Sequence, residues 1–315
     1  QALTSRSVGS PGRSEFVSDS SPSLQSIWTW PLPLAAVWLV VPVAGLLLRI
    51  ELEPIAPHDY WWHLAMGRMI AVTGEIPGAN LFLYTLPADQ PFFDQPWLGQ
   101  WGMYRLLAFG GHAGLVVCRN LITALTWTGL LLAALGRCRD PRMTGGYLLL
   151  IAAVTAPIFG VRTQMFAFIP YVCLVASLLA VADGRWSRRW LWGLLPMTAL
   201  WANVHGTFVL APVLVALTGG ALVVEEWLEE GKIATRRAGW WMGLTLAVAT
   251  SACLTPFGPD VYVYVVELTF GSDLSSTVSE WRSPDPGEPF GLITLASILG
   301  STLVLGVRRR SVQLY

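Results

Sequence analysis

The sequence predicts an all-α integral membrane protein with about eight transmembrane helices. The chain has 315 residues, of which 54% are hydrophobic and 13% are charged, and its mean hydropathy is +0.53. Soluble domains carry about 25% charged residues, and half that fraction leaves too little polar surface to cover a water-soluble globule. Apolar runs of about twenty residues, the length that crosses a bilayer, recur along the chain. These observations exclude a soluble enzyme and a secreted disulfide scaffold.

Two regions of different composition divide the chain. Residues 1–26 are rich in Ser, contain Pro and Gly, and lack apolar periodicity, which predicts a disordered cytoplasmic tail. Residues 27–315 are predicted to form a single polytopic membrane domain. Its apolar spans are expected near residues 31–50, 113–135, 145–160, 164–182, 190–203, 207–224, 238–255 and 289–307.

The basic residues indicate the orientation of these spans. Fourteen of the 20 Lys and Arg residues fall in the tail or in connectors on one side, and cytoplasmic loops are enriched in such residues. An even number of spans puts both ends of the chain on that side, so both termini are predicted to be cytoplasmic.

The net charge is zero, so the chain lacks the excess of positive charge that attracts a nucleic acid, and no nucleic-acid partner is expected. The membrane lipids are the expected surroundings.

The opposite, outer side carries two long loops, predicted at about residues 51–112 and 255–289. Loops of this length in a compact protein are usually functional. All four histidines map to the outer side, whereas haem ligands would be expected at membrane depth. We therefore expect no haem, and no nucleotide. The four cysteines show no metal-binding spacing.

The first outer loop contains the clearest candidate for chemistry. Asp59 is placed to open a helix, and His63 lies four residues later on the same face. A carboxylate and an imidazole one turn apart could act as a base and its orienting group, or could hold a divalent cation. A structural alternative, favoured by spacing alone, is that Asp59 caps the helix and His63 is a hydrogen-bonded interfacial residue. A second amphipathic helix is predicted from Pro96 to Phe109, lying on the bilayer.

Several motifs, taken together and in order, resemble a large group of bacterial polytopic membrane proteins similar to the GT-C superfamily of integral-membrane glycosyltransferases. Its first outer loop reads D-x-D-x-W-W-H-L-x-x-G, then G-x-I-P-x-x-D-x-F-S-Y-T. The matching segments here are 58–67, 74–85, Arg162–Phe166 (family R-P-Q-L-F), Trp201–Gly206 (N-x-H-G), Pro256–Gly258 (N-P-Y-G) and Glu280–Trp281 (E-W).

This resemblance implies a location in the bacterial inner membrane and a polyprenyl-phosphate-linked sugar as donor, attacked outside the cytoplasm by an acceptor hydroxyl. By position, Asp59 and His63 would be catalytic, with Asp59 as the base or as a metal-contacting carboxylate. Arg162 would face the donor phosphate, a role that competes with snorkelling to lipid headgroups. The other implied substrate-binding residues are Gln164, Asn203, His205 and Glu280. Asn203 and His205 could equally form a structural polar plug between two spans, and Glu280 could be a solvated loop residue.

The sequence also departs from the family pattern. The first Asp of D-x-D is Pro57, the Asp after Ile-Pro is Asn80, the Ser before Tyr-Thr is Leu83, and an acidic position after Trp-Leu is Gln100. Loss of carboxylates is what a non-catalytic descendant would show. Two functions are therefore predicted: GT-C-like glycosyl transfer, or a non-catalytic GT-C-derived subunit that packs with other membrane subunits in a larger complex.

Overall fold

The computed structural model describes residues 32–55, 57–79, 81–82, 87, 89, 91–232, 234–271, 285–289 and 291–299. Its secondary structure in these residues is helical, apart from one isolated bridge between Ala79 and Pro91. The predicted tail at residues 1–26 and the predicted site residue Glu280 lie outside the described residues.

The all-α prediction is confirmed for this part of the chain. The α-helices are α1 (Leu32–Glu51), α2 (Pro57–Thr73), α3 (Trp97–Cys138), α4 (Pro141–Thr155), α5 (Phe168–Ala182), α6 (Leu194–Ala202), α7 (Leu210–Glu230), α8 (Thr235–Ser251) and α9 (Asp260–Phe270). Short 3₁₀ turns lead into α5, α6 and α7: η3 (Thr163–Ala167), η4 (Arg188–Gly193) and η5 (Gly206–Val209). One further turn, η2 (Ala156–Ile158), follows α4.

Four helical segments of the described chain are long and apolar enough to cross a membrane: Leu34–Glu51, Trp97–Cys138, Thr163–Ala182 and Gly206–Glu230. Helices α4 and α8, with 15 and 17 residues, are shorter. At 1.5 Å per residue they span about 23 and 26 Å, less than the roughly 30 Å hydrocarbon core of a bilayer. The structure thus has the helical character of a membrane protein.

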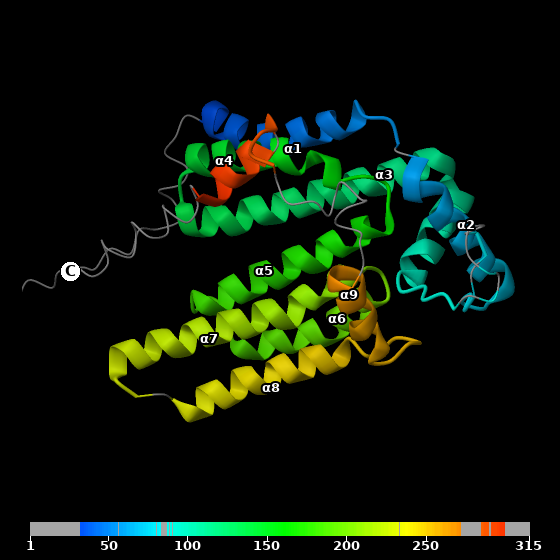
Figure 1. Ribbon diagram of the computed structural model, residues 1–315. Helices are drawn as coiled ribbons and strands as arrows, with labels where there is room; N and C mark the ends of the chain where they lie inside the picture. Colours follow the sequence, from blue (N-terminus) through cyan, green and yellow to red (C-terminus); the bar gives the residue numbers. More distant parts are fainter. Residues whose placement is uncertain are drawn as a thin grey trace, which may run out of the picture.

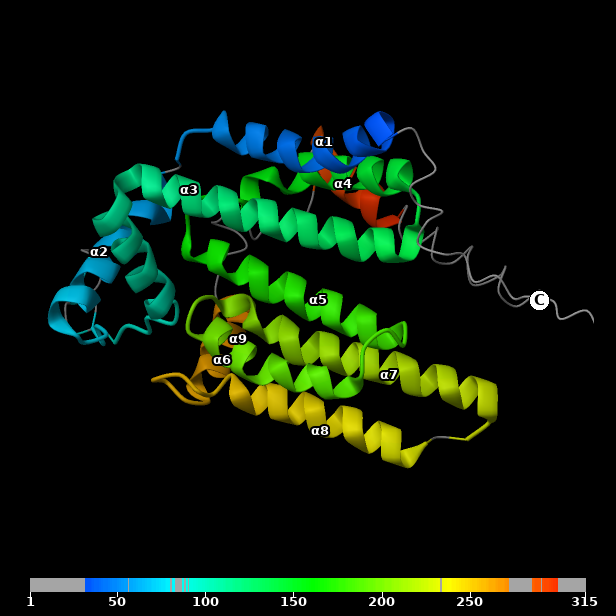
Figure 2. The same ribbon diagram turned by 180° about the vertical axis from the view of Figure 1, so that it is seen from behind.

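The long helices lie side by side and run in alternate directions, as both views show (Figures 1 and 2). One end of the bundle carries α2, the first part of α3, α9 and the turn between α6 and α7. The opposite end carries the connections α3–α4, α5–α6 and α7–α8. These three connections hold the basic residues Arg137, Arg139, Arg142, Arg185, Arg188, Arg189, Lys232, Arg236 and Arg237. We call the first end the outer end and the second the basic end.

Two differences from the predicted elements concern the outer end. The predicted interfacial helix at 96–109 and the predicted span at 113–135 are both present, but as one element, α3, which bends at Gly111. Gly111 has φ of 61° and ψ of −163°, a conformation that glycine adopts readily and other residues do not. The second outer loop contains a helix, α9, whose buried Val261 belongs to the same hydrophobic cluster as residues of α6 and α8.

Close backbone contact fixes α2 on α3. Gly67 faces the backbone of Gln100, and a Cβ at Gly67 would lie 2.0 Å from the Gln100 carbonyl oxygen. Small residues allow such approaches between membrane helices. Buried Tyr60, Leu64 and Met103 fill the rest of this contact. The packing places Asp59 next to Arg162, which precedes α5, and His63 near His205, which follows α6.

Candidate functional site

Two candidate residues from distant segments form an ion pair at the outer end. Asp59 stands in the first turn of α2, and Arg162 precedes η3 in extended backbone. An oxygen of the Asp59 carboxylate lies 3.1 Å from a terminal nitrogen of the Arg162 guanidinium. The Asp59 side chain is 54% exposed and that of Arg162 is 24% exposed. The carboxylate therefore stays open to solvent, while the guanidinium is mostly enclosed.

His63 lies one turn after Asp59 and faces the start of α3. Its Nδ1 is 3.4 Å from Nε2 of Gln100. Burial, and to a smaller extent the positive charge of Arg162, lower the pKa of His63 to about 4, although the Asp59 carboxylate acts in the opposite direction. The imidazole is therefore neutral at physiological pH.

His205 belongs to the same group of charges, although it comes from the turn between α6 and α7. It caps η5, and its Nδ1 accepts a hydrogen bond from the Thr207 backbone N–H at 3.2 Å. Burial lowers its pKa to about 4, and the positive charge that His63 carries when protonated and that of Arg162 act in the same direction. The structure thus brings together Asp59, His63, Arg162 and His205, which we call the outer cluster.

Both the oxygen and the nitrogen of the side-chain amide of Asn203, another candidate, form hydrogen bonds within the protein. Its oxygen accepts a hydrogen bond from the Trp97 indole N–H at 2.8 Å. Its nitrogen donates to the carbonyl oxygens of Ala199, at 2.8 Å, and Leu254, at 3.0 Å. Asn203 is 7% exposed. These contacts join α3, α6 and the end of α8, and they favour the structural-plug interpretation over ligand contact.

Sequence reasoning missed a buried polar pair behind His63. Asp94 and Gln100 are each 1% exposed, and the Gln100 amide donates a hydrogen bond to Asp94 Oδ1 at 2.8 Å. Burial raises the pKa of Asp94 to about 6, even though this hydrogen bond lowers it. The signal in the sequence was weak: Asp94 and Gln100 flank the aromatic start of α3 at a spacing of six residues. Only the tertiary structure shows that both are enclosed.

A metal role for Asp59 and His63 stays a prediction. Within the described residues, no group of three or more His, Cys, Asp or Glu side chains is placed to hold a metal ion. A histidine that binds metal through Nε2 carries its proton on Nδ1, where it donates to an acceptor. Here Nδ1 of His63 is in contact with the Gln100 amide nitrogen, which is a donor.

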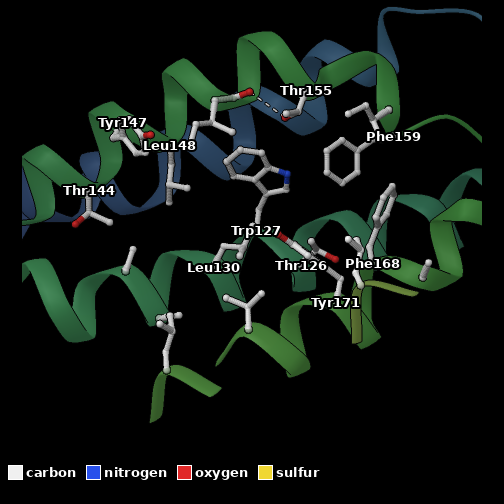
Figure 3. A pocket seen from close by; sticks show the side chains of 18 of the residues that line it. Thr126, Trp127, Leu130, Thr144, Tyr147, Leu148, Thr155, Phe159, Phe168 and Tyr171 are labelled. Atoms are coloured by element: carbon white, nitrogen blue, oxygen red, sulfur yellow. Dashed lines mark hydrogen bonds between the residues drawn. The ribbon is translucent and has the colours of Figure 1, made fainter. Parts of the chain in front are cut away.

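An apolar cavity of about 950 Å³ lies between α3, α4 and α5. Figure 3 shows Trp127 rising from α3 toward α4, with Leu148, Phe159 and Phe168 around it. At one end the cavity is lined by Arg137 and Cys138 of the basic end. At the other it is lined by Trp201, Thr207 and Gln164, the last of which is a predicted substrate-binding residue. Since Thr207 contacts His205, this second end lies beside the outer cluster.

No family model, curated protein or solved structure matches this chain. The resemblance to the GT-C superfamily therefore rests on the motifs and remains a prediction.

Proposed function

We propose that this protein is a GT-C-like glycosyltransferase that uses a polyprenyl-phosphate-linked sugar at the outer face of the bacterial inner membrane. The observation that carries the proposal is the Asp59–Arg162 pair. A solvent-open carboxylate and a mostly enclosed guanidinium, about a hundred residues apart in sequence, meet beside the end of an apolar cavity. Such a site could take a ligand with a charged head and an apolar chain.

The cavity suits the chain of such a lipid. Its walls are mostly aliphatic and aromatic side chains from α3, α4 and α5 (Figure 3), and its lining extends from Arg137 and Cys138 to Gln164 and Thr207. An isoprenoid chain seated there would gain the free energy of burying apolar surface. Its phosphate would then emerge near Arg162, whose planar guanidinium can bind two phosphate oxygens at once.

The proposed reaction is a direct displacement at the anomeric carbon. Asp59 takes the proton of the acceptor hydroxyl, whose oxygen forms a bond to the anomeric carbon. The bond between that carbon and the phosphate oxygen breaks, and the phosphate leaves with the electron pair. Arg162 stabilises the growing negative charge on the phosphate. Phosphate binding would also compete with Asp59 for Arg162, which frees the carboxylate to act as a base.

We further propose eight spans with both termini in the cytoplasm. The alternate direction of the helices supports this arrangement, as does the concentration of basic residues in the connections at one end. The short helices α4, α6 and α8 lie alongside the four longer segments, and the eighth span would include the helical residues 291–299.

A second candidate function is a non-catalytic subunit of a larger membrane complex. The observation that favours it is the character of Gln100, a buried amide at a position where the family motif is acidic. In this case the polar contacts of the outer cluster would stabilise the fold, and other membrane subunits would be the partners.

A transfer assay separates the two functions. The purified protein in proteoliposomes would be given a panel of polyprenyl-phosphate sugars. Asp59→Asn should reduce transfer by about 10²- to 10⁴-fold, because it removes a positioned base. Glu75→Gln, which changes an exposed carboxylate just after α2, is the matched control and should retain activity. Absence of transfer by the parent protein, together with stoichiometric co-purification of other membrane subunits, would favour the second function.

A further inference from the structure

The hydrogen bonds at the two histidines of the outer cluster determine which ring nitrogen carries the proton. Gln100 Nε2 can only donate, so its contact with His63 requires a lone pair on Nδ1 of His63. The backbone N–H of Thr207 is likewise a donor, so Nδ1 of His205 also carries a lone pair. A neutral imidazole has one proton, and in both rings it must therefore lie on Nε2.

The buried pair behind His63 holds the Gln100 amide in this orientation. Asp94 Oδ2 and Gln100 Oε1 are both buried without a hydrogen-bond partner among the described residues. The two side chains already face each other through Asp94 Oδ1 and Gln100 Nε2. With a pKa of about 6, the Asp94 carboxylate is ionised at neutral pH and can only accept, so the end of the Gln100 amide that faces Oδ1 is its NH₂ group. One amide hydrogen remains for His63.

From these contacts we infer that the outer cluster is an oxyanion site in which His63 and His205 act as neutral hydrogen-bond donors through Nε2, beside Arg162. Gln100 is then the positioning residue for His63, and the Thr207 backbone holds His205. The inference rests on the proposed function and assigns a role to each residue of the site. The two histidines and Arg162 bind the phosphate oxygens, and Asp59 accepts the proton of the acceptor hydroxyl. A base or metal-ligand role for His63 would need a lone pair on Nε2.

Nitrogen NMR of the ¹⁵N-histidine-labelled full chain in detergent tests the protonation pattern without a ligand. His63→Asn and His205→Asn variants would assign the signals. Both histidines should show a protonated Nε2 and a bare Nδ1 at neutral pH. Gln100→Glu should reverse the pattern at His63, because a carboxylate accepts a proton from Nδ1, and should leave His205 unchanged. A protonated Nδ1 at His63 in the parent protein would overturn the inference.

Binding of farnesyl phosphate, compared with farnesol, tests the oxyanion role. His63→Phe removes the donor and should weaken binding of the phosphate by about ten- to hundredfold, the value of one hydrogen bond to a charged group. His63→Gln supplies an amide N–H and should recover most of the loss. Equal effects of His63→Phe on the phosphate and the alcohol, or no rescue by His63→Gln, would contradict the inference, and melting temperatures would identify variants that fail to fold.

These measurements also separate this inference from the proposed function. If the protein binds farnesyl phosphate through donor histidines but transfers no sugar, the oxyanion site is supported and the proposed glycosyl transfer is wrong. If it transfers sugar while His63 carries its proton on Nδ1, the glycosyl transfer is supported and the donor role of His63 is wrong.

Discussion

Asn203 provides a quantitative test of how the outer end is held together. The Asn203→Ala variant removes three side-chain hydrogen bonds, which join the amide to Trp97, Ala199 and Leu254. Such bonds contribute about 0.6–1 kcal/mol each in membrane proteins and in soluble ones. The free energy of unfolding should therefore fall by about 2–3 kcal/mol. The backbone contact between the Asn203 carbonyl and the N–H of Leu98 remains in the variant.

Equilibrium unfolding in mixed detergent micelles would measure this loss, with Trp97→Phe as the matched variant because it removes only one of the three bonds. Trp97→Phe should cost about 1 kcal/mol, and its effect should largely disappear in the Asn203→Ala background, since the partner is already gone. If Asn203→Ala unfolded like the parent protein but bound a lipid-linked sugar more weakly, Asn203 would be a ligand contact and the structural interpretation would be wrong.

Three further predictions concern packing, pH and topology. Gly67→Ala should destabilise the protein by about 1–3 kcal/mol, because its Cβ would meet the Gln100 carbonyl at 2.0 Å, and a thermal melt would show it. Lowering the pH from about 7.5 to about 5 should lower the free energy of unfolding. Each histidine of the outer cluster has a pKa lowered to about 4 and binds fewer protons in the folded than in the unfolded state over this range, so each contributes a loss of about 2 kcal/mol. Asp94, whose pKa is raised to about 6, binds more protons in the folded state and offsets about 1 kcal/mol of that loss. A melting temperature that is unchanged or higher at the lower pH would contradict this balance. Cysteines introduced at Gly231 and Glu75 should label from opposite sides of the membrane, and labelling of both from outside would refute the topology.

The order of the helices was predictable because membrane spans leave a strong signal. Long apolar runs and alternating basic connectors are properties of the sequence itself, and the observed helices follow them. The positions of Asp59 and His63 on one helix were predictable for a similar reason, since residues four apart share a face. The bend in α3 coincides with the Gly110–Gly111 pair.

Other features of the site depend on tertiary contacts that no local pattern encodes. Asp94 looks like an ordinary loop carboxylate in the sequence, but the fold buries it and pairs it with Gln100. Asn203 lies in a motif that the GT-C resemblance associates with substrate, yet its amide is used to join three parts of the fold. The cavity between α3, α4 and α5 also arises only from packing.

The central claim is that the outer cluster receives the phosphate of a lipid whose chain lies in the neighbouring cavity. An electron cryo-microscopy structure of the protein in nanodiscs with a polyprenyl-phosphate sugar tests it most directly. We expect phosphate density within hydrogen-bond distance of Arg162 and chain density along Trp127 and Phe159, with Asp59 released from the ion pair. An Asp59–Arg162 pair that stays closed, with the lipid bound elsewhere or the cluster covered by another subunit, would contradict it.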